Sequence, residues 1–313
     1  MRLALMLALM PLAAFAATYE ISGRTDPPST VPVFLHGATT PFESSAVTDP
    51  QGRFRFRKLE AGAYTLAVMT QARGEVLQTV DLSPGTVDPK GRLEVVVRLD
   101  QSHLESDAAR TPGATISART LSLPPRAIRE YREAQQCLAR HDTENAAAHL
   151  QRAVEAAPDF AAAWNQLGTI AYQTGRYDAA ETNFRRALDA DPDAFEPLVN
   201  LGGVLLNLQR PEEALACNRR AVARRPNDAL ANSQLGLTWF QLNDLDNAAR
   251  SLETAVRLDP AHFSHPQLTL AQIYARRGDR VSAAAQLRDF LKRHPDAPEA
   301  SSVRESIARL ENR

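Results

Sequence analysis

Two histidines of this sequence have a spacing that could support chemistry. His262 and His265 stand three residues apart, and on a helix that spacing can place two imidazoles together, as a metal site requires. Both flank a turn that contains proline, which favours a loop over a helix at this point. We therefore interpret them as solvated loop residues, and we predict no metal site and no cofactor.

Other motifs that carry chemistry are missing or have a simpler interpretation. The sequence holds no Gly-x-Ser-x-Gly, no His-Glu-x-x-His, no phosphate loop and no dinucleotide fingerprint. The short basic clusters "RRPND", "ARRGDR" and "FLKRHP" stand near the ends of expected helices, where basic residues interact favourably with the helix dipole. "TWF" at 238–240 could be a platform for sugars, but Trp239 fits a core position and Phe240 should point elsewhere. We predict that the protein is not an enzyme.

The bulk composition narrows the class of protein further. The chain has 313 residues, which suggests about two domains. Lys and Arg number 36 and Asp and Glu number 37, so the basic excess of a typical nucleic-acid-binding protein is lacking. We predict no nucleic-acid partner.

The first sixteen residues, "MRLALMLALMPLAAFA", differ from the rest of the chain. An early Arg, an apolar run and the small residues Ala14 and Ala16 form the pattern of a secretory signal peptide. A retained N-terminal anchor is the alternative, although the apolar run is short for a membrane helix. We predict an exported protein, periplasmic or secreted, without stable membrane insertion after cleavage of residues 1–16.

Residues 17–100 alternate with a period of two, which indicates half-buried strands. In "GRFRFRK" Phe54 and Phe56 share one face, and in "AYTLAVMT" Tyr64, Leu66 and Val68 do so. Turn sequences such as "TDPQGR" separate these runs, and several short strands at such intervals favour an antiparallel β-sandwich.

The phrase "VTDPQGRFRFRKLEAGAYTLAVMT" resembles the carboxypeptidase regulatory-like domain, a transthyretin-like sandwich. The resemblance rests on a Thr-Asp-x-x-Gly turn, a Phe-rich strand and a "Leu-x-x-Gly-x-Tyr" corner at Leu59, Gly62 and Tyr64. It implies a fold for residues 18–100 and little about function. No zinc-ligand arrangement of a carboxypeptidase is present.

After a Ser-, Thr- and Pro-containing linker at 101–125, the sequence repeats itself every 34 residues. Each repeat ends in a proline, and an alanine precedes that proline by twelve residues in every copy. The prolines are Pro158, Pro192, Pro226, Pro260 and, after 35 residues, Pro295. "Leu-Gly" recurs as Leu167-Gly168, Leu201-Gly202 and Leu235-Gly236. The pattern resembles the tetratricopeptide repeat, so we predict an all-α superhelical solenoid.

Five repeats cover 126–295, with approximate limits at 126–160, 161–194, 195–228, 229–263 and 264–297. A capping helix at 298–313 should follow. The glycines and alanines are expected where two helices approach closely, and the apolar faces are expected to be buried by stacking. Cys137 and Cys217 fall in repeats one and three, so we predict that they form no disulfide.

The resemblance also implies a concave groove lined by the first helix of each repeat. Its neutral and mixed residues suit a protein or peptide ligand rather than a terminal carboxylate, because lysine and arginine are missing from the fifth positions. The predicted groove residues are Asn165, Thr169, Tyr172, Val199, Leu206, Asn207, Leu230, Ser233, Phe240 and Gln241.

We therefore expect an exported, non-catalytic adaptor or scaffold that binds a protein in this groove. One alternative is a carbohydrate- or cell-wall-binding protein that uses the β-sandwich, which an exposed aromatic patch would favour. Another is an accessory subunit of an envelope export or assembly complex.

Overall fold

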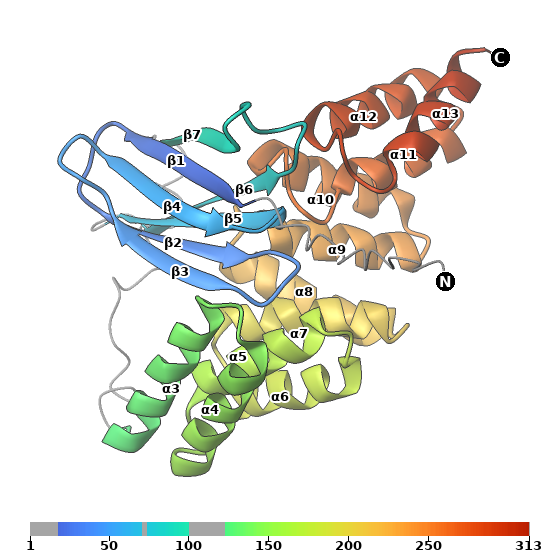
Figure 1. Ribbon diagram of the computed structural model, residues 1–313. Helices are drawn as coiled ribbons and strands as arrows, with labels where there is room; N and C mark the ends of the chain where they lie inside the picture. Colours follow the sequence, from blue (N-terminus) through green and yellow to red (C-terminus); the bar gives the residue numbers. More distant parts are fainter. Residues whose placement is uncertain (1–17, 71–73, 100–122, 313) are drawn as a thin grey trace, which may run out of the picture.

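The computed structural model describes residues 18–70, 74–99 and 123–312. The predicted signal segment and most of the predicted linker lie outside these residues. Within them, strands come first and helices follow, which confirms the predicted fold class (Figure 1). No helix among the described residues is long and apolar enough to cross a membrane.

The strands form two sheets. Their bounds are β1 Tyr19–Asp26, β2 Pro32–Gly37, β3 Glu43–Val47, β4 Arg53–Leu59, β5 Gly62–Thr70, β6 Gly74–Leu82 and β7 Arg92–Arg98. One sheet has the order β4-β1-β7 and the other β3-β2-β5-β6. The pairs are antiparallel except for β1 and β7, which run parallel, in contrast to the fully antiparallel sandwich that we predicted.

The alternation in the sequence builds the core between these sheets. Phe54 and Phe56 are each 5% exposed, and Tyr64, Leu66 and Val68 are buried beside them. The Tyr64 hydroxyl donates to the Glu60 carbonyl at 3.0 Å, which fixes the corner before β5. In the turn before β4, Gly52 has φ +73° and its N–H donates to the Asp49 carbonyl at 2.8 Å.

Helices then follow in pairs. Their bounds are α3 Pro125–Leu138, α4 Thr143–Ala156, α5 Ala161–Gln173, α6 Tyr177–Ala190, α7 Phe195–Asn207, α8 Pro211–Arg224, α9 Ala229–Gln241, α10 Leu245–Leu258, α11 Pro266–Arg276, α12 Arg280–Arg293 and α13 Ala300–Glu311. Each helix contacts the next along the chain, so the pairs stack into a solenoid (Figure 1).

A glycine on the first helix of a repeat faces the second helix of the same repeat. A Cβ on Gly168 would lie 2.5 Å from the Phe184 ring, and one on Gly236 would lie 2.6 Å from Leu252. A buried side chain of the second helix makes the nearest contact, and at Gly236 the backbone nitrogen of Leu252 also comes within 3.1 Å of the added Cβ. The spacing of the pattern therefore reflects side-chain packing across the pair.

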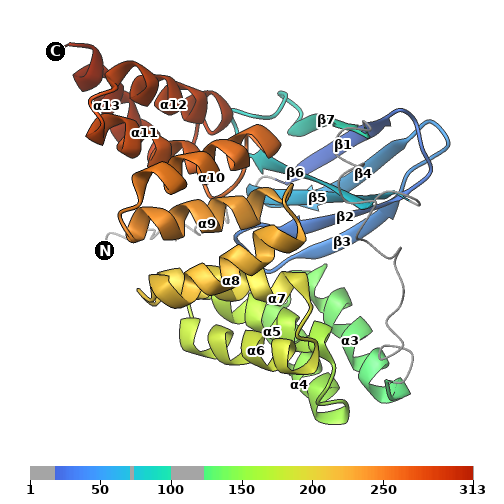
Figure 2. The same cartoon turned by 180° about the vertical axis from the view of Figure 1, so that it is seen from behind.

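The β-sandwich lies against the solenoid rather than apart from it. Both cartoons show the sheets beside α3 at one end of the solenoid and reaching α10 and α12 at the other (Figures 1 and 2). The two parts keep separate hydrophobic cores, because no buried apolar cluster among the described residues includes side chains from both.

Candidate functional site

The first helices of successive pairs form one continuous surface. Helices α5, α7, α9 and α11 contact one another in sequence, as well as their own partners. We call the side formed by α3, α5, α7, α9 and α11 the first-helix surface. It is the place where the sequence predicted a groove.

Four of the predicted groove residues form an accessible row on this surface, which we call the open strip: Tyr172, Asn207, Phe240 and Gln241. Asn207 Nδ2 donates to the Tyr172 hydroxyl at 3.2 Å and to the Gly203 carbonyl at 2.9 Å. Asn207 and Gln241 are exposed, and Tyr172 and Phe240 are half-buried. Both amide hydrogens of Asn207 are therefore engaged, and its side-chain oxygen can accept a partner's N–H.

Phe240 is partly covered by a cation. The Arg276 guanidinium carbon lies 4.7 Å from the centre of the Phe240 ring, while Arg219 lies 4.9 Å from the Trp239 ring. Both aromatic side chains pack partly against the same core cluster. Phe240 thus presents a stacked ring and cation rather than a bare ring, an arrangement that suits an aromatic or acidic side chain.

Other predicted groove residues are enclosed by the solenoid itself. Val199 and Leu206 are 3% and 5% exposed, and Ser233 is fully buried, with its hydroxyl 2.6 Å from that of Ser264. These three positions face neighbouring helices, because adjacent first helices pack together along the surface. They are not accessible to a ligand in this arrangement.

The remaining predicted residues are half-buried and bonded locally. Asn165 Oδ1 accepts from Asn200 Nδ2 at 3.3 Å, and the Thr169 hydroxyl donates to the Asn165 carbonyl at 3.1 Å. Leu230 packs against the cluster around Phe195. These groups stabilise the neighbouring repeats and leave the open strip as the accessible part of the prediction.

The sequence analysis did not predict that another segment of the same chain lies on the first-helix surface. Residues 37–43, from the last residue of β2 to the first residue of β3, lie against α3 and α5, and we call them the docked turn. Gln173 Nε2 donates to the Gly37 carbonyl at 3.0 Å. Gln135 and Gln166 donate to the Glu43 carboxylate at 3.2 and 3.3 Å. Gln173 directly follows the predicted groove residue Tyr172, but nothing in the sequence identified its partner.

A second contact joins the edge strand β6 and the turn after it to the residues that follow α10 and α12. The backbone N–H of Thr79 donates to Asp259 Oδ2 at 3.0 Å, and that of Gly85 donates to Asp296 Oδ2 at 2.6 Å. Glu75 lies 4.0 Å from Arg225. Burial raises the pKa of Asp259, and the Thr79 hydrogen bond opposes this rise.

Of the two histidines that we expected to be solvated, His262 is buried and His265 is half-buried. His262 is 3% exposed, and its Nδ1 accepts the Ser264 N–H at 3.2 Å. Burial, followed by the charges of His265 and His294, lowers the pKa of His262 to about 3, and burial followed by the charge of His294 lowers the pKa of His265 to about 4. The turn is folded inward, so these rings are structural. Among the described residues, no group of three or more histidine, cysteine or acidic side chains could hold a metal.

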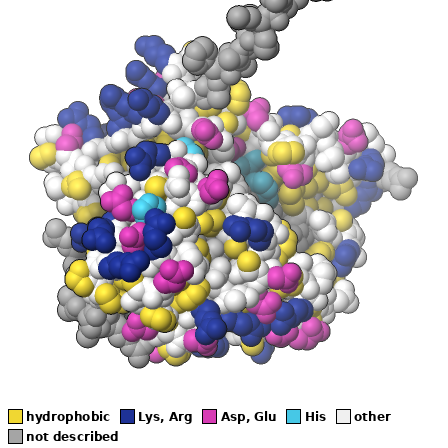
Figure 3. Space-filling view, turned by 60° about the horizontal axis from the view of Figure 1, so that its bottom comes forward, with side chains coloured by type: hydrophobic (Ala, Val, Ile, Leu, Met, Phe, Trp, Pro, Cys, Tyr) yellow, Lys and Arg dark blue, Asp and Glu magenta, His cyan; other side chains and the backbone are white. Residues whose placement is uncertain are grey.

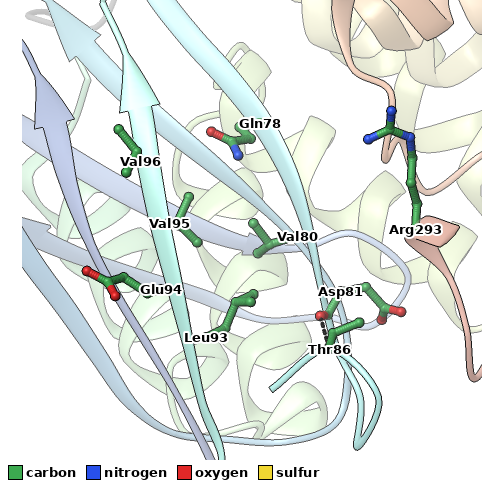
Figure 4. A pocket seen from close by; sticks show the side chains of 9 residues that line it. All are labelled: Gln78, Val80, Asp81, Thr86, Leu93, Glu94, Val95, Val96 and Arg293. Carbon is green, nitrogen blue, oxygen red and sulfur yellow. Dashed lines mark hydrogen bonds between the residues drawn. The ribbon is translucent and has the colours of Figure 1, made fainter. Parts of the chain in front are cut away.

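A hollow of about 250 Å³ opens between β6 and β7, with Arg293 of α12 at one side (Figure 4). Its lining residues are Gln78, Val80, Asp81, Thr86, Leu93, Glu94, Val95, Val96 and Arg293. The Thr86 hydroxyl donates to the Asp81 carbonyl at 2.7 Å, so it supports the turn. Arg293 Nε lies 3.0 Å from Asp289 Oδ2. Thr86 and Arg293 are thus both engaged in local pairings.

Neither the charged side chains on the face shown in Figure 3 nor the two thiols form a further candidate site among the described residues. Basic, acidic and hydrophobic side chains are interspersed on the face shown in Figure 3. Cys137 is buried and Cys217 half-buried, and both are free thiols, as we predicted.

Two family models match the helical part. Residues 132–259 match the middle TPR-like domain of cilia and flagella-associated protein 70, and residues 268–304 match the tetratricopeptide repeat. These matches, together with the stacked helix pairs, show that the helical part is a tetratricopeptide-type solenoid. The resemblance of residues 18–100 to the carboxypeptidase regulatory-like domain stays a prediction.

Curated relatives share parts of the chain. BBSome complex member BBS4 of Xenopus tropicalis is 28% identical over 138 residues, which is 44% of this chain and 27% of that protein. Cellulose synthase operon protein C of Pseudomonas fluorescens is 27% identical over 270 residues, which is 80% of this chain and 20% of that protein. The chain thus spans about a quarter or less of the length of these two relatives.

Solved structures share the solenoid. Residues 41 to the end of MamA from Desulfovibrio magneticus RS-1 are 25% identical, with a TM-score of 0.50 over 56% of this chain and 99% of that chain. PilW, described as a widely conserved type IV pilus biogenesis factor, is 21% identical, with a TM-score of 0.51 over 60% of this chain and 92% of that chain. The likeness to PilW shows the fold alone.

Proposed function

We propose that this tetratricopeptide-type solenoid, joined to its β-sandwich, is a non-catalytic adaptor that binds a protein segment along its first-helix surface. The observation that carries the proposal is the open strip. Tyr172, Asn207 and Phe240 come from three successive first helices and offer rings, amides and a stacked cation in one row. This combination suits an extended segment, which needs apolar contact and partners for its backbone.

The strip favours a protein ligand over the sugar ligand that we kept as an alternative. Sugar binding by the sandwich would need exposed aromatic rings. Among the described residues, the exposed large hydrophobic side chains are Val47, Leu77, Val96 and Val281, none of them aromatic. The alternative of an envelope assembly subunit differs only in its partner, and the likeness to a protein of a cellulose synthase operon favours it.

We propose further that the protein is exported, on the basis of the pattern in residues 1–16. Intact-mass measurement of the protein from an envelope fraction should show a chain that begins at Ala17. A full-length species retained in the membrane would contradict this.

The adaptor proposal is tested by affinity capture from the envelope fraction, followed by mass spectrometry. Proteins held by the wild-type chain should be lost with Phe240→Ala and with Asn207→Ala. Truncation of an aromatic anchor commonly costs about 2 kcal/mol or more, equivalent to roughly a thirtyfold loss of affinity. Val281→Ala, which truncates a side chain that is 82% exposed on α12, is the matched control. Unchanged capture by both strip variants, each with a normal melt, would contradict the proposal.

A further inference from the structure

The docked turn shows which chemistry the first-helix surface accepts. It offers three kinds of group to α3, to the turn after α3 and to α5: a carboxylate from Glu43, an aromatic ring from Phe42 and backbone carbonyls from Gly37 and Ala38. Each meets a side chain of the solenoid. We therefore interpret the docked turn as a ligand that is part of the same chain.

The carboxylate is held by neutral amides. Gln135 Nε2 donates to one oxygen of Glu43 at 3.2 Å, and Gln166 Nε2 donates to the other at 3.3 Å. Among the described residues, Glu43 makes no ion pair. Burial, and then the negative charge of Glu43, raise the pKa of Tyr131, which stands on α3 beside this site. The surface thus accepts an acidic group through two glutamines from adjacent repeats.

The ring and the carbonyls complete the set. The Phe42 ring stacks on His141 with centroids 4.7 Å apart and meets Tyr64 edge-on at 5.6 Å. Gln173 Nε2 donates to the Gly37 carbonyl at 3.0 Å. His141 Nε2 is buried and has no partner among the described residues. A backbone carbonyl or carboxylate of a better-fitting ligand would satisfy that nitrogen.

The contact is also of a kind that can be released. The sandwich and the solenoid share no hydrophobic core cluster, so the turn is held by the hydrogen bonds to three glutamines and by the stack of Phe42 on His141. Interfaces of this composition permit relative movement of two domains. Gln173 follows Tyr172 directly, so the docked turn abuts the open strip. A segment that extends along the strip toward α3 would meet the turn.

We propose that the docked turn is an intramolecular stand-in for the partner, and that the partner carries an aromatic residue followed by an acidic residue. Such a segment displaces the turn and binds His141 with its ring, Gln135 and Gln166 with its carboxylate, and Gln173 with its backbone. The inference rests on the proposed binding function of the first-helix surface. It adds the partner's chemistry and an autoinhibitory contact.

The test uses the full chain and a fluorescein-labelled peptide with the sequence of residues 36–45, HGATTPFESS. Fluorescence anisotropy should give a Kd at least tenfold lower for Glu43→Ala than for the wild type, because the variant frees both glutamines. Adding Gln166→Ala to this variant should raise the Kd at least tenfold again. Glu60→Ala, which removes an exposed acid elsewhere on the sandwich, should behave like the wild type.

Peptides with alanine in place of Phe or Glu should bind Glu43→Ala at least tenfold more weakly. Equal Kd values for all chains, or no binding to a normally melting Glu43→Ala chain, would overturn the inference. If the Glu43→Ala chain melts early, the double variant Asp259→Ala, Asp296→Ala, which loosens the β6 contact, replaces it in the peptide titration. The same decrease in Kd is then expected, and the same results would overturn the inference. Should the peptide fail while Phe240→Ala still loses captured proteins, only the docked-turn inference falls and the adaptor function stands.

Discussion

At the scale of the residue, the eighth position of these repeats requires glycine because the side chain sixteen residues later packs directly against it. Gly168, Gly202 and Gly236 face Phe184, Asn218 and Leu252 in turn. In the third repeat that side chain is a buried amide, and Asn218 Nδ2 donates to the Thr238 hydroxyl at 2.9 Å. The repeat therefore tolerates different groups opposite the glycine but no Cβ in its place.

Two neighbouring glycines of α7 allow a direct test of this packing. A Cβ on Gly202 would clash with the fixed Asn218 side chain, whereas one on Gly203 would meet only the movable end of Gln234 at 2.8 Å. Alanine gains about 1 kcal/mol over glycine in a helix, but overpacking costs about 1–3 kcal/mol. Thermal melts should show Gly203→Ala unchanged or stabilised and Gly202→Ala destabilised. Equal shifts would contradict the packing.

The buried His262 makes stability depend on pH. Burial, followed by the charges of His265 and His294, holds the pKa of His262 at about 3 in the folded chain, below the ordinary 6.5. Between these values only the unfolded chain binds the proton. The contribution to stability is therefore full above pH 6.5 and falls as the pH drops toward 3. Asp259 acts in the opposite sense, because burial raises its pKa in the folded chain.

We expect the melting temperature to fall between pH 7 and pH 5, with an upper bound near 1.4 kcal/mol per pH unit for one fully buried histidine. His262→Asn keeps an acceptor for the Ser264 N–H and should flatten this dependence. His149→Asn, which removes a half-buried histidine of α4 beside Glu130 and leaves the 262–265 turn untouched, is the comparison. A wild-type melting temperature that rises on acidification would show that the buried carboxylates dominate.

At the scale of the element, β6 is an edge strand whose free backbone groups meet the solenoid. Edge strands expose unpaired N–H and C=O groups that invite association with other chains. Here the carboxylates of Asp259 and Asp296 accept the N–H groups of Thr79 and Gly85. The loops that follow α10 and α12 thus cover an edge that the sandwich alone would leave open.

Hydrogen exchange at Thr79 should report this cover. Asp259→Ala removes the acceptor, and a hydrogen bond to a charged group contributes about 1.5–3 kcal/mol, so the Thr79 amide should exchange roughly ten- to a hundredfold faster. Asp259→Asn keeps an acceptor oxygen without the buried charge and should preserve the protection. Identical exchange in the two variants would mean that the contact does not protect β6.

At the scale of the whole molecule, the sandwich and the solenoid have separate hydrophobic cores and contact each other at both ends of the solenoid. The docked turn binds α3 and α5, while the carboxylates after α10 and α12 bind the sandwich near β6. This placement leaves the open strip between neighbouring first helices accessible.

The arrangement predicts a measurable change of shape. Glu43→Ala combined with Asp259→Ala should raise the radius of gyration in small-angle X-ray scattering while both parts keep their secondary structure. Glu60→Ala with Asp246→Ala removes the same charge from exposed positions and should leave the radius unchanged. A compact double variant would indicate that other contacts hold the parts together.

The local patterns of the sequence were enough for the fold. Period-two runs placed Phe54 and Tyr64 in a sandwich core, and the 34-residue period placed Gly168 and its equivalents at a close helix contact. Both are properties of single elements or adjacent elements, where spacing alone decides which side chains share a face. The register also predicted Tyr172, Asn207 and Phe240 as groove residues; they are at least partly accessible, and their role in binding stays a prediction.

Only the tertiary structure decided which of these positions stay accessible and what covers the others. Ser233 and His262 are buried by neighbouring helices and turns, and residues 37–43 meet Gln135, Gln166 and Gln173 across roughly a hundred residues of chain or more. The sequence by itself determined the elements, because periodicity is local. It could not determine the docking of sandwich on solenoid, because those few polar contacts join segments that no repeat or spacing links.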